Sequence, residues 1–78
     1  MMKLNELRPG RKARVESFEG ATTELETKLR EVGFSEGDEV EMLTHGPFGG
    51  RTLAVRLNRS IIALRGGEAA MIRVEELA

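Results

Sequence analysis

Residues 23–43, with the sequence TELETKLREVGFSEGDEVEML, specify a short helix that leads directly into a turn and a strand. Thr23 and Glu26 have the spacing of a capping box, in which each side chain accepts a hydrogen bond from the other residue's backbone N–H. This pattern predicts that a helix begins at about residue 23. Because the helix is only about ten residues long, it is not stable alone and must pack against the rest of the domain.

The apolar and charged residues of this helix separate onto two faces. Leu25, Leu29 and Val32 recur at helical spacing, which predicts one buried face. The charged residues between positions 24 and 30 fall on the opposite face, as expected for a solvated surface. Two pairs stand four residues apart with the acid first, an order that favours ion pairing: Glu24 with Lys28 and Glu26 with Arg30.

The end of the helix is marked by Gly33 and Phe34. We expect Gly33 to take positive φ, and Phe34 to make the apolar contact of a Schellman motif with Leu29. The turn-forming residues 35–38 come next, and the alternation that begins near Val40 predicts a strand. A helix therefore feeds directly into a strand.

Length and composition limit the classes of protein that this sequence can form. The chain has 78 residues and is expected to form one domain, residues 1–78, with a small core. It has no cysteine, which excludes disulfides and thiolate metal sites. No apolar run is long enough for membrane insertion, and no signal peptide is evident. A net charge of −1 and a pI of about 5.8 do not favour a nucleic-acid partner.

The rest of the sequence predicts short strands separated by glycine, proline and asparagine turn signals. With the strand that begins near Val40, the segments with strand-like patterns make five: they also include residues 12–18, 52–57, 60–65 and 72–75. Strand 60–65 is apolar on both faces, which predicts a central position in the sheet. Residues 68–71 are expected to make one helical turn. So many strands in so short a chain favour a closed or nearly closed barrel.

An ordered series of residues along nearly the whole chain resembles the ferrous iron transport protein A (FeoA) family: Leu7-x-x-Gly10, Leu29-x-x-x-Gly33-Phe34-x-x-Gly37, His45-Gly46-Pro47-Phe48-Gly49, and Glu68-Ala69 ahead of Ile72-x-Val74. The resemblance implies a mainly β fold: a small SH3-like five-stranded barrel with an inserted helix at about 23–32 and a helical turn at about 68–71. The same fold is similar to the C-terminal domain of iron-dependent repressors of the diphtheria toxin repressor type.

One residue departs from the pattern of the FeoA family. Glu36 stands before the turn residue Gly37, where many members of the family have proline. Since proline fixes φ in such a turn, its loss is expected to loosen the turn slightly.

Phe48, between Pro47 and Gly49, is the candidate contact residue of the sequence. Apolar side chains on loops often serve in recognition, so Pro47, Phe48 and Gly49 are a candidate protein-binding site. The alternative is that Phe48 folds back as a plug on the open end of the barrel. The two are compatible if the side chain is half-buried.

The sequence indicates no catalytic or cofactor site. His45 is the only histidine, and its candidate metal-binding partners are spread along one strand rather than converging: Asp38, Glu39 and Glu41. We expect a surface histidine, with at most weak or indirect binding of a transition metal. No serine-histidine-acid set or phosphate-binding loop is evident, so the protein is not expected to be an enzyme.

The resemblance also implies a function. A FeoA-like protein is expected to be a cytoplasmic accessory or regulatory protein of bacterial ferrous iron uptake, which contacts the cytoplasmic part of the FeoB-type permease. The alternative is a free-standing regulatory module related to the SH3-like domain of iron-dependent transcriptional repressors. Weak self-association is left open.

Overall fold

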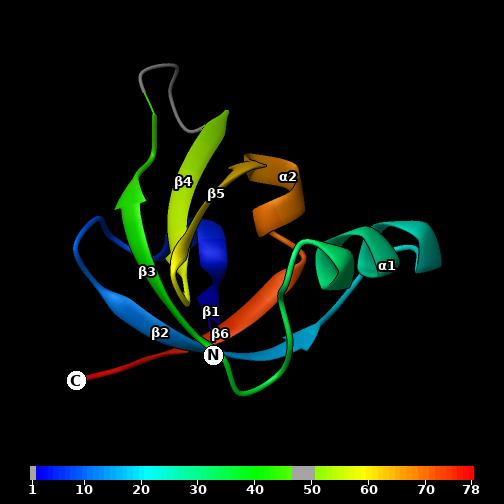
Figure 1. Cartoon of the computed structure of the whole chain (residues 1–78), viewed down its shortest axis with the longest axis horizontal. Helices are drawn as coiled ribbons and strands as arrows, with labels where there is room; N and C mark the ends of the chain where they lie inside the picture. Colours follow the sequence, from blue (N-terminus) through cyan, green and yellow to red (C-terminus); the bar gives the residue numbers. More distant parts are fainter. Residues whose placement is uncertain (1, 47–50) are drawn as a thin grey trace.

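The structure, a computed structural model, describes residues 2–46 and 51–78. The elements in chain order are β1 (Met2–Lys3), η1 (Leu4–Glu6), β2 (Lys12–Phe18), α1 (Thr23–Glu31), β3 (Glu39–Thr44), β4 (Thr52–Leu57), β5 (Ser60–Arg65), α2 (Gly66–Ala69) and β6 (Ile72–Glu76). The strands form one antiparallel sheet in the order β1-β6-β2-β3-β4-β5, which curves around a core (Figure 1). The mainly β, SH3-like fold predicted from the sequence is confirmed.

The sheet has six strands, where the sequence analysis counted five. The additional strand is β1, which pairs Met2 with Val74 and Lys3 with Arg73 of β6. A strand of two residues is too short to show an alternating pattern, so no sequence signal marked it. β1 and β5 stand at the two ends of the strand order, and β6 lies between β1 and β2.

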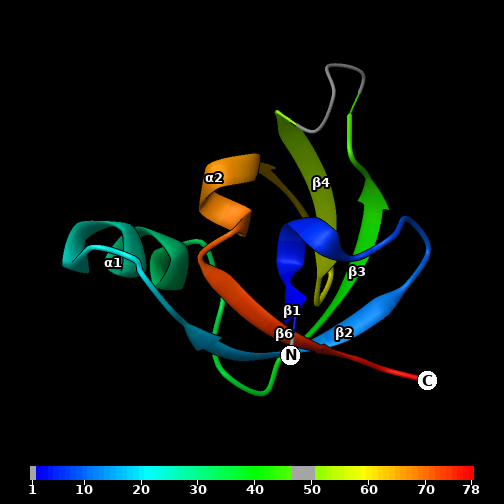
Figure 2. The same ribbon diagram turned by 180° about the vertical axis from the view of Figure 1, so that it is seen from behind.

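The core lies on the concave side of the sheet and includes the N-terminal segment. Leu4 and Leu7 are fully buried, and both views place η1 in the middle of the molecule (Figure 1, Figure 2). The strands contribute alternate residues to the interior, as expected for a sheet with one buried face. The other buried residues are Ala13, Val15, Leu29, Phe34, Val40, Met42, Leu53, Val55, Leu57, Leu64, Ala69, Ile72 and Val74.

The prediction that strand 60–65 is central was wrong, because β5 is an edge strand that pairs with β4 alone among the described strands. Its inner residue Leu64 is buried, but Ile61 is 64% exposed and Ala63 is also exposed. Apolar residues on both faces therefore do not mean burial on both faces here. The outer face of this strand carries apolar side chains into solvent.

The N-terminus of α1 differs from the predicted capping box by one residue. Thr22, not Thr23, is the N-cap, and its Oγ1 accepts a hydrogen bond from the N–H of Leu25 at 3.1 Å. Adjacent threonines offer the same cap chemistry, so the sequence alone does not distinguish them. Of the predicted apolar face, Leu29 is buried, but Val32 at the C-cap is 45% exposed. Val32 leaves the core because the chain turns away at the next residue.

The predicted end of α1 is confirmed in detail. Gly33 has φ of 119° and donates its N–H to the carbonyl of Arg30 at 3.1 Å. The N–H of Phe34 reaches the carbonyl of Leu29, also at 3.1 Å. These two bonds define a Schellman motif, and both Phe34 and Leu29 belong to the core.

The helical turn expected at 68–71 lies earlier in the chain, as α2 over Gly66–Ala69. Gly66 and Gly67 are the first residues of α2, although glycines are expected to end the strand and precede the helical turn. Glu68 explains the start, because its carboxylate accepts the backbone N–H of Arg65 at 3.0 Å and Nζ of Lys28 at 3.0 Å. These two bonds hold the pKa of Glu68 below its usual value and tie α1 to α2.

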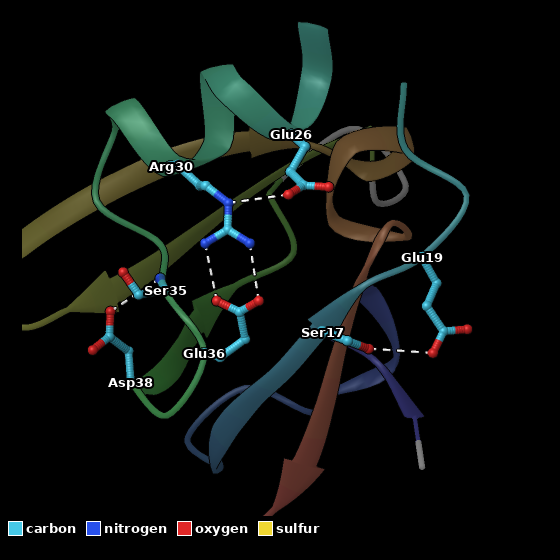
Figure 3. A network of polar contacts seen from close by, with 7 residues as sticks. All are labelled: Ser17, Glu19, Glu26, Arg30, Ser35, Glu36 and Asp38. Atoms are coloured by element: carbon cyan, nitrogen blue, oxygen red, sulfur yellow. Dashed lines mark hydrogen bonds and ion pairs between the residues drawn. The ribbon is translucent and has the colours of Figure 1, made fainter. Parts of the chain in front are cut away.

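A polar network ties α1 to the turn before β3 (Figure 3). The guanidinium of Arg30 donates two parallel hydrogen bonds to the Glu36 carboxylate, both at 2.9 Å, and its Nε donates to Glu26 at 3.1 Å. The same guanidinium lies 4.7 Å from the centre of the Phe18 ring on β2. The turn that lacks proline is thus restrained by an ion pair to the helix.

The Arg30 pair predicts an unusually acidic carboxyl at Glu36. Hydrogen bonds from Arg30 and a backbone N–H lower the pKa of Glu36 from 4.5 to about 2. The pair therefore favours the folded state above pH 4.5, and this contribution is lost as the pH falls through about 2. In an NMR titration of the side-chain carboxyls, Arg30→Met is expected to return the pKa of Glu36 toward 4.5.

Lys28→Met provides the control, because Lys28 contacts Glu68 rather than Glu36. It is expected to raise the pKa of Glu68 and leave that of Glu36 unchanged. A Glu36 carboxyl that titrates at its ordinary value in the parent protein would show that the Arg30 pair does not form in solution.

Candidate interaction surface

The loop predicted to bind a partner connects β3 to β4. Pro47, Phe48 and Gly49 lie outside the described residues, so their role stays a prediction. The described ends of the two strands are close together at Gly46 and Thr52. Gly46 has φ of 76°, and a Cβ at this position would collide with the carbonyl oxygen of Thr52. Glycine is therefore required where the loop begins.

His45 supports the N-terminal segment rather than a metal. Its Nε2 lies 2.7 Å from the backbone carbonyl oxygen of Leu7, which can only accept a hydrogen bond, so Nε2 carries the proton. The histidine is half-buried, not fully exposed as a surface histidine would be. The bond joins the end of β3 to the segment between η1 and β2.

Two of the three carboxylates considered as metal ligands, Asp38 and Glu41, have other partners. Asp38 accepts the N–H of Ser35 at 3.2 Å, and Glu41 pairs with Arg56 at 3.0 Å across β3 and β4. Over residues 2–46 and 51–78, no group of three or more histidine, cysteine, aspartate and glutamate side chains could hold a metal ion. Within the same ranges, no helix has the length and apolar character needed to span a membrane.

Among the described residues, the more exposed of the two large apolar side chains that face solvent lies on β5. Ile61, at 64% exposure, stands opposite Arg56 on the outer face, and Ala63 stands opposite Ala54. Next to Arg56 on β3 is Glu41, so the apolar residues border an ion pair. Small and apolar side chains thus reach the free edge of the sheet without a covering element among the described residues.

The arginines of β4, β5 and the turn between them do not form one continuous strip. Arg56 is paired with Glu41, whereas Arg59 and Arg65 flank β5 at its two ends and are exposed. Neither of these two forms an ion pair in the part of the chain that the structure describes. The cations therefore mark the ends of the apolar edge.

Sequence reasoning missed the β5 edge as a candidate site, because it placed this strand in the centre of the sheet. A signal was present: Arg59 and Arg65 bracket the apolar residues 61–64. Charged residues of this kind commonly protect strand edges from uncontrolled pairing.

The chain is similar in sequence and structure to proteins of ferrous iron transport. Iron(II) transport protein A from Clostridium thermocellum is 37% identical, with a TM-score of 0.88 over 97% of this chain. FeoA from Stenotrophomonas maltophilia, solved in complex with zinc and described as a prokaryotic SH3 domain protein, is 39% identical, with a TM-score of 0.81 over 96% of this chain.

These matches span different shares of the relatives. The chain covers 91% of the S. maltophilia protein but only 46% of the C. thermocellum protein. A manganese-dependent transcriptional repressor has a TM-score of 0.86 over 96% of this chain and 41% of its own length. Its identity is 20%, so it shares the fold alone.

No match was found among curated proteins. The family model described as the FeoA domain, in contrast, matches residues 2–76. The match covers every described strand and both helices, and it agrees with the solved FeoA structures. This chain belongs to the FeoA family, whose members are tied to ferrous iron transport.

Proposed function

We propose that this chain is a cytoplasmic accessory protein of bacterial ferrous iron uptake, which regulates a FeoB-type permease by direct contact with the permease's cytoplasmic part. Membership of the FeoA family supports the connection to iron uptake. The observation that carries contact as the mode of action is the exposed apolar edge of β5, with Ile61 at 64% exposure. The proposal assigns the chain no catalytic activity and no cofactor.

The loop that contains Pro47, Phe48 and Gly49 is proposed as one anchor of this contact. The chain has three phenylalanines. Phe34 is fully buried, and Phe18 packs against the core and beneath Arg30. Phe48 is the aromatic residue without an assigned structural role, and aromatic residues are enriched among the few side chains that dominate protein–protein binding.

Replacing Phe48 with serine tests this anchor. We expect the Phe48→Ser variant to bind the isolated cytoplasmic domain of a FeoB-type permease at least about tenfold more weakly in calorimetry, as expected for the loss of an aromatic anchor. Thermal melting should show that the fold persists. Val32→Ser is the matched control, because it removes an exposed apolar side chain at the end of α1.

Two outcomes contradict this site. A folded Phe48→Ser variant that binds as tightly as the parent would exclude the loop, and an unfolded variant would favour the plug interpretation. If the parent itself does not bind the permease domain, the proposed partner is wrong.

A second candidate function is a free-standing regulatory module of an iron-dependent transcription factor. It is favoured by the fold shared with the manganese-dependent repressor. Neighbouring genes discriminate between the two functions. A permease gene next to this one supports the first, and a repressor gene that lacks its own SH3-like domain supports the second.

A further inference from the structure

We propose that the free edge of β5 binds an extended segment of a partner protein, apolar in its middle and acidic at both ends, as an added antiparallel strand. This inference deepens the proposed function. It rests on the proposed function in one respect, that the partner is a protein.

The backbone of β5 presents hydrogen-bonding groups to solvent at alternate residues. The two-residue connection between Leu57 and Ser60 makes these two residues a hydrogen-bonded pair, and the N–H of Gly66 still reaches the carbonyl of Arg51 at 3.0 Å in the same register. The N–H and C=O groups of residues 60, 62, 64 and 66 therefore face β4. Those of residues 61, 63 and 65 face away from the sheet.

The outward groups at the end of the strand are partly used. The N–H of Arg65 donates to the Glu68 carboxylate at 3.0 Å, which limits the free edge at that end. Ile61 and Ala63 remain, each with one donor and one acceptor, and no strand among the described residues pairs with them. This is enough for four hydrogen bonds to one added strand. The opposite edge, β1, is only two residues long.

The side chains of the edge suit an apolar strand. Ile61 is 64% exposed and stands in a cross-strand row with Arg56 and Glu41. Ala63 is small, so it permits close approach of another backbone. An added strand would place one of its apolar side chains beside Ile61 and remove this surface from water.

The charges at the two ends of β5 select acidic residues in the partner. Arg59 and Arg65 are both exposed, and neither is in an ion pair within the described residues. Beyond Ala63 the surface is hollowed between β5 and α2, and Lys28 and Glu68 line the hollow with Arg65. Two cations and one carboxylate line the hollow, so it keeps an excess of positive charge.

The same charges oppose pairing of β5 with a second copy of itself. If the outward groups of Ile61 were bonded to those of Ala63 in the other copy, the two-fold axis would pass beside Ile62. Arg59 would then face Arg65 of the other copy at both ends of the interface. Like charges directly opposite each other destabilise a strand pair, so a partner with acidic ends is favoured over a dimer.

The first test uses synthetic peptides and the full chain. The probe is a seven-residue peptide of alternating valine and threonine with a glutamate at each end, and its control has lysine at both ends. We expect the acidic peptide to slow amide hydrogen exchange at Ile61 and Ala63, measured by NMR. The amides of Ile62 and Leu64, which already face β4, should change little. The lysine-ended peptide should bind at least about tenfold more weakly.

Variants of β5 distinguish backbone pairing at this edge from non-specific binding to exposed apolar side chains. Ile61→Lys is expected to abolish the exchange protection while the fold persists, since the residue is exposed and a charged side chain suits an edge strand. Ala63→Pro removes an outward N–H, which edge strands tolerate, and should have the same effect. Val32→Lys is the matched control at an exposed apolar residue outside β5, at the C-cap of α1, and it should bind as the parent does.

The permease domain provides the second arm of the test. Binding with protection of the Ile61 and Ala63 amides supports both the edge and the proposed partner. Binding of the permease domain without that protection contradicts the proposal that β5 is the binding site, and it still supports the permease as the partner. Peptide binding without permease binding supports the edge alone. The inference is wrong if neither the acidic peptide nor the permease domain binds. It is also wrong if the protein forms concentration-dependent dimers that protect the same amides.

Discussion

Replacing Phe34 with alanine is expected to destabilise the fold by about 3–5 kcal/mol, the cost of truncating a large, fully buried aromatic side chain. Phe34 has no exposed surface and is the last residue of the Schellman motif that ends α1. A domain of this length has a total stability of about 4–12 kcal/mol at ordinary values per residue. The variant should therefore lose much of its stability, as measured by the urea midpoint and slope.

Phe18→Ala is the matched control for this variant. Phe18 is half-buried and packs at the border of the core, where Arg30 covers its ring. Its truncation leaves no closed cavity, so the loss of stability should be clearly smaller than for Phe34. Equal losses in the two variants would mean that Phe34 is not the centre of the helix-to-core junction.

Replacing Gly46 with alanine is expected to have the other large effect. The residue has positive φ, and its added Cβ would collide with the backbone carbonyl of Thr52. The strained conformation alone costs about 1–3 kcal/mol. The collision adds to that cost, because a backbone atom of β4 has to move rather than a flexible side chain.

Gly10→Ala isolates the contribution of the collision. Gly10 has φ of 86°, similar to that of Gly46, but a Cβ there would meet nothing within 4 Å. The difference between the two variants in unfolding free energy thus measures the close approach of β3 and β4. If Gly46→Ala is no more destabilising than Gly10→Ala, the two strand ends are further apart in solution.

The parts of the fold that were predictable from sequence are those fixed by neighbours in the chain. The end of α1 at Gly33 and Phe34 is an example, because both hydrogen bonds and the positive φ belong to six consecutive residues. The inner faces of β3 and β4 were also evident, since period-two alternation reports burial on one side of a sheet directly.

The predictions from sequence were wrong where a structural feature depends on contacts between residues far apart in the chain. Whether Ile61 is covered depends on which strand, if any, lies beyond β5, and the sequence of β5 is the same in either case. The bond that ties α2 to α1 joins Glu68 and Lys28, which are 40 residues apart. The same limit applies to the candidate site, since the β5 edge became visible only once the strand order was known.

The pairing of β1 with β6 also has a consequence for synthesis of the protein. β6 lies between β1 and β2, so residues 72–76 join two strands that are made before all the other described strands. The β4–β5 hairpin can form early, because its closing pair, Leu57 and Ser60, is local. The sheet as a whole is completed only after residue 76 has left the ribosome. Until then Leu4 and Leu7 have no finished core to enter, so the nascent chain exposes the apolar surface that makes partly folded chains aggregate.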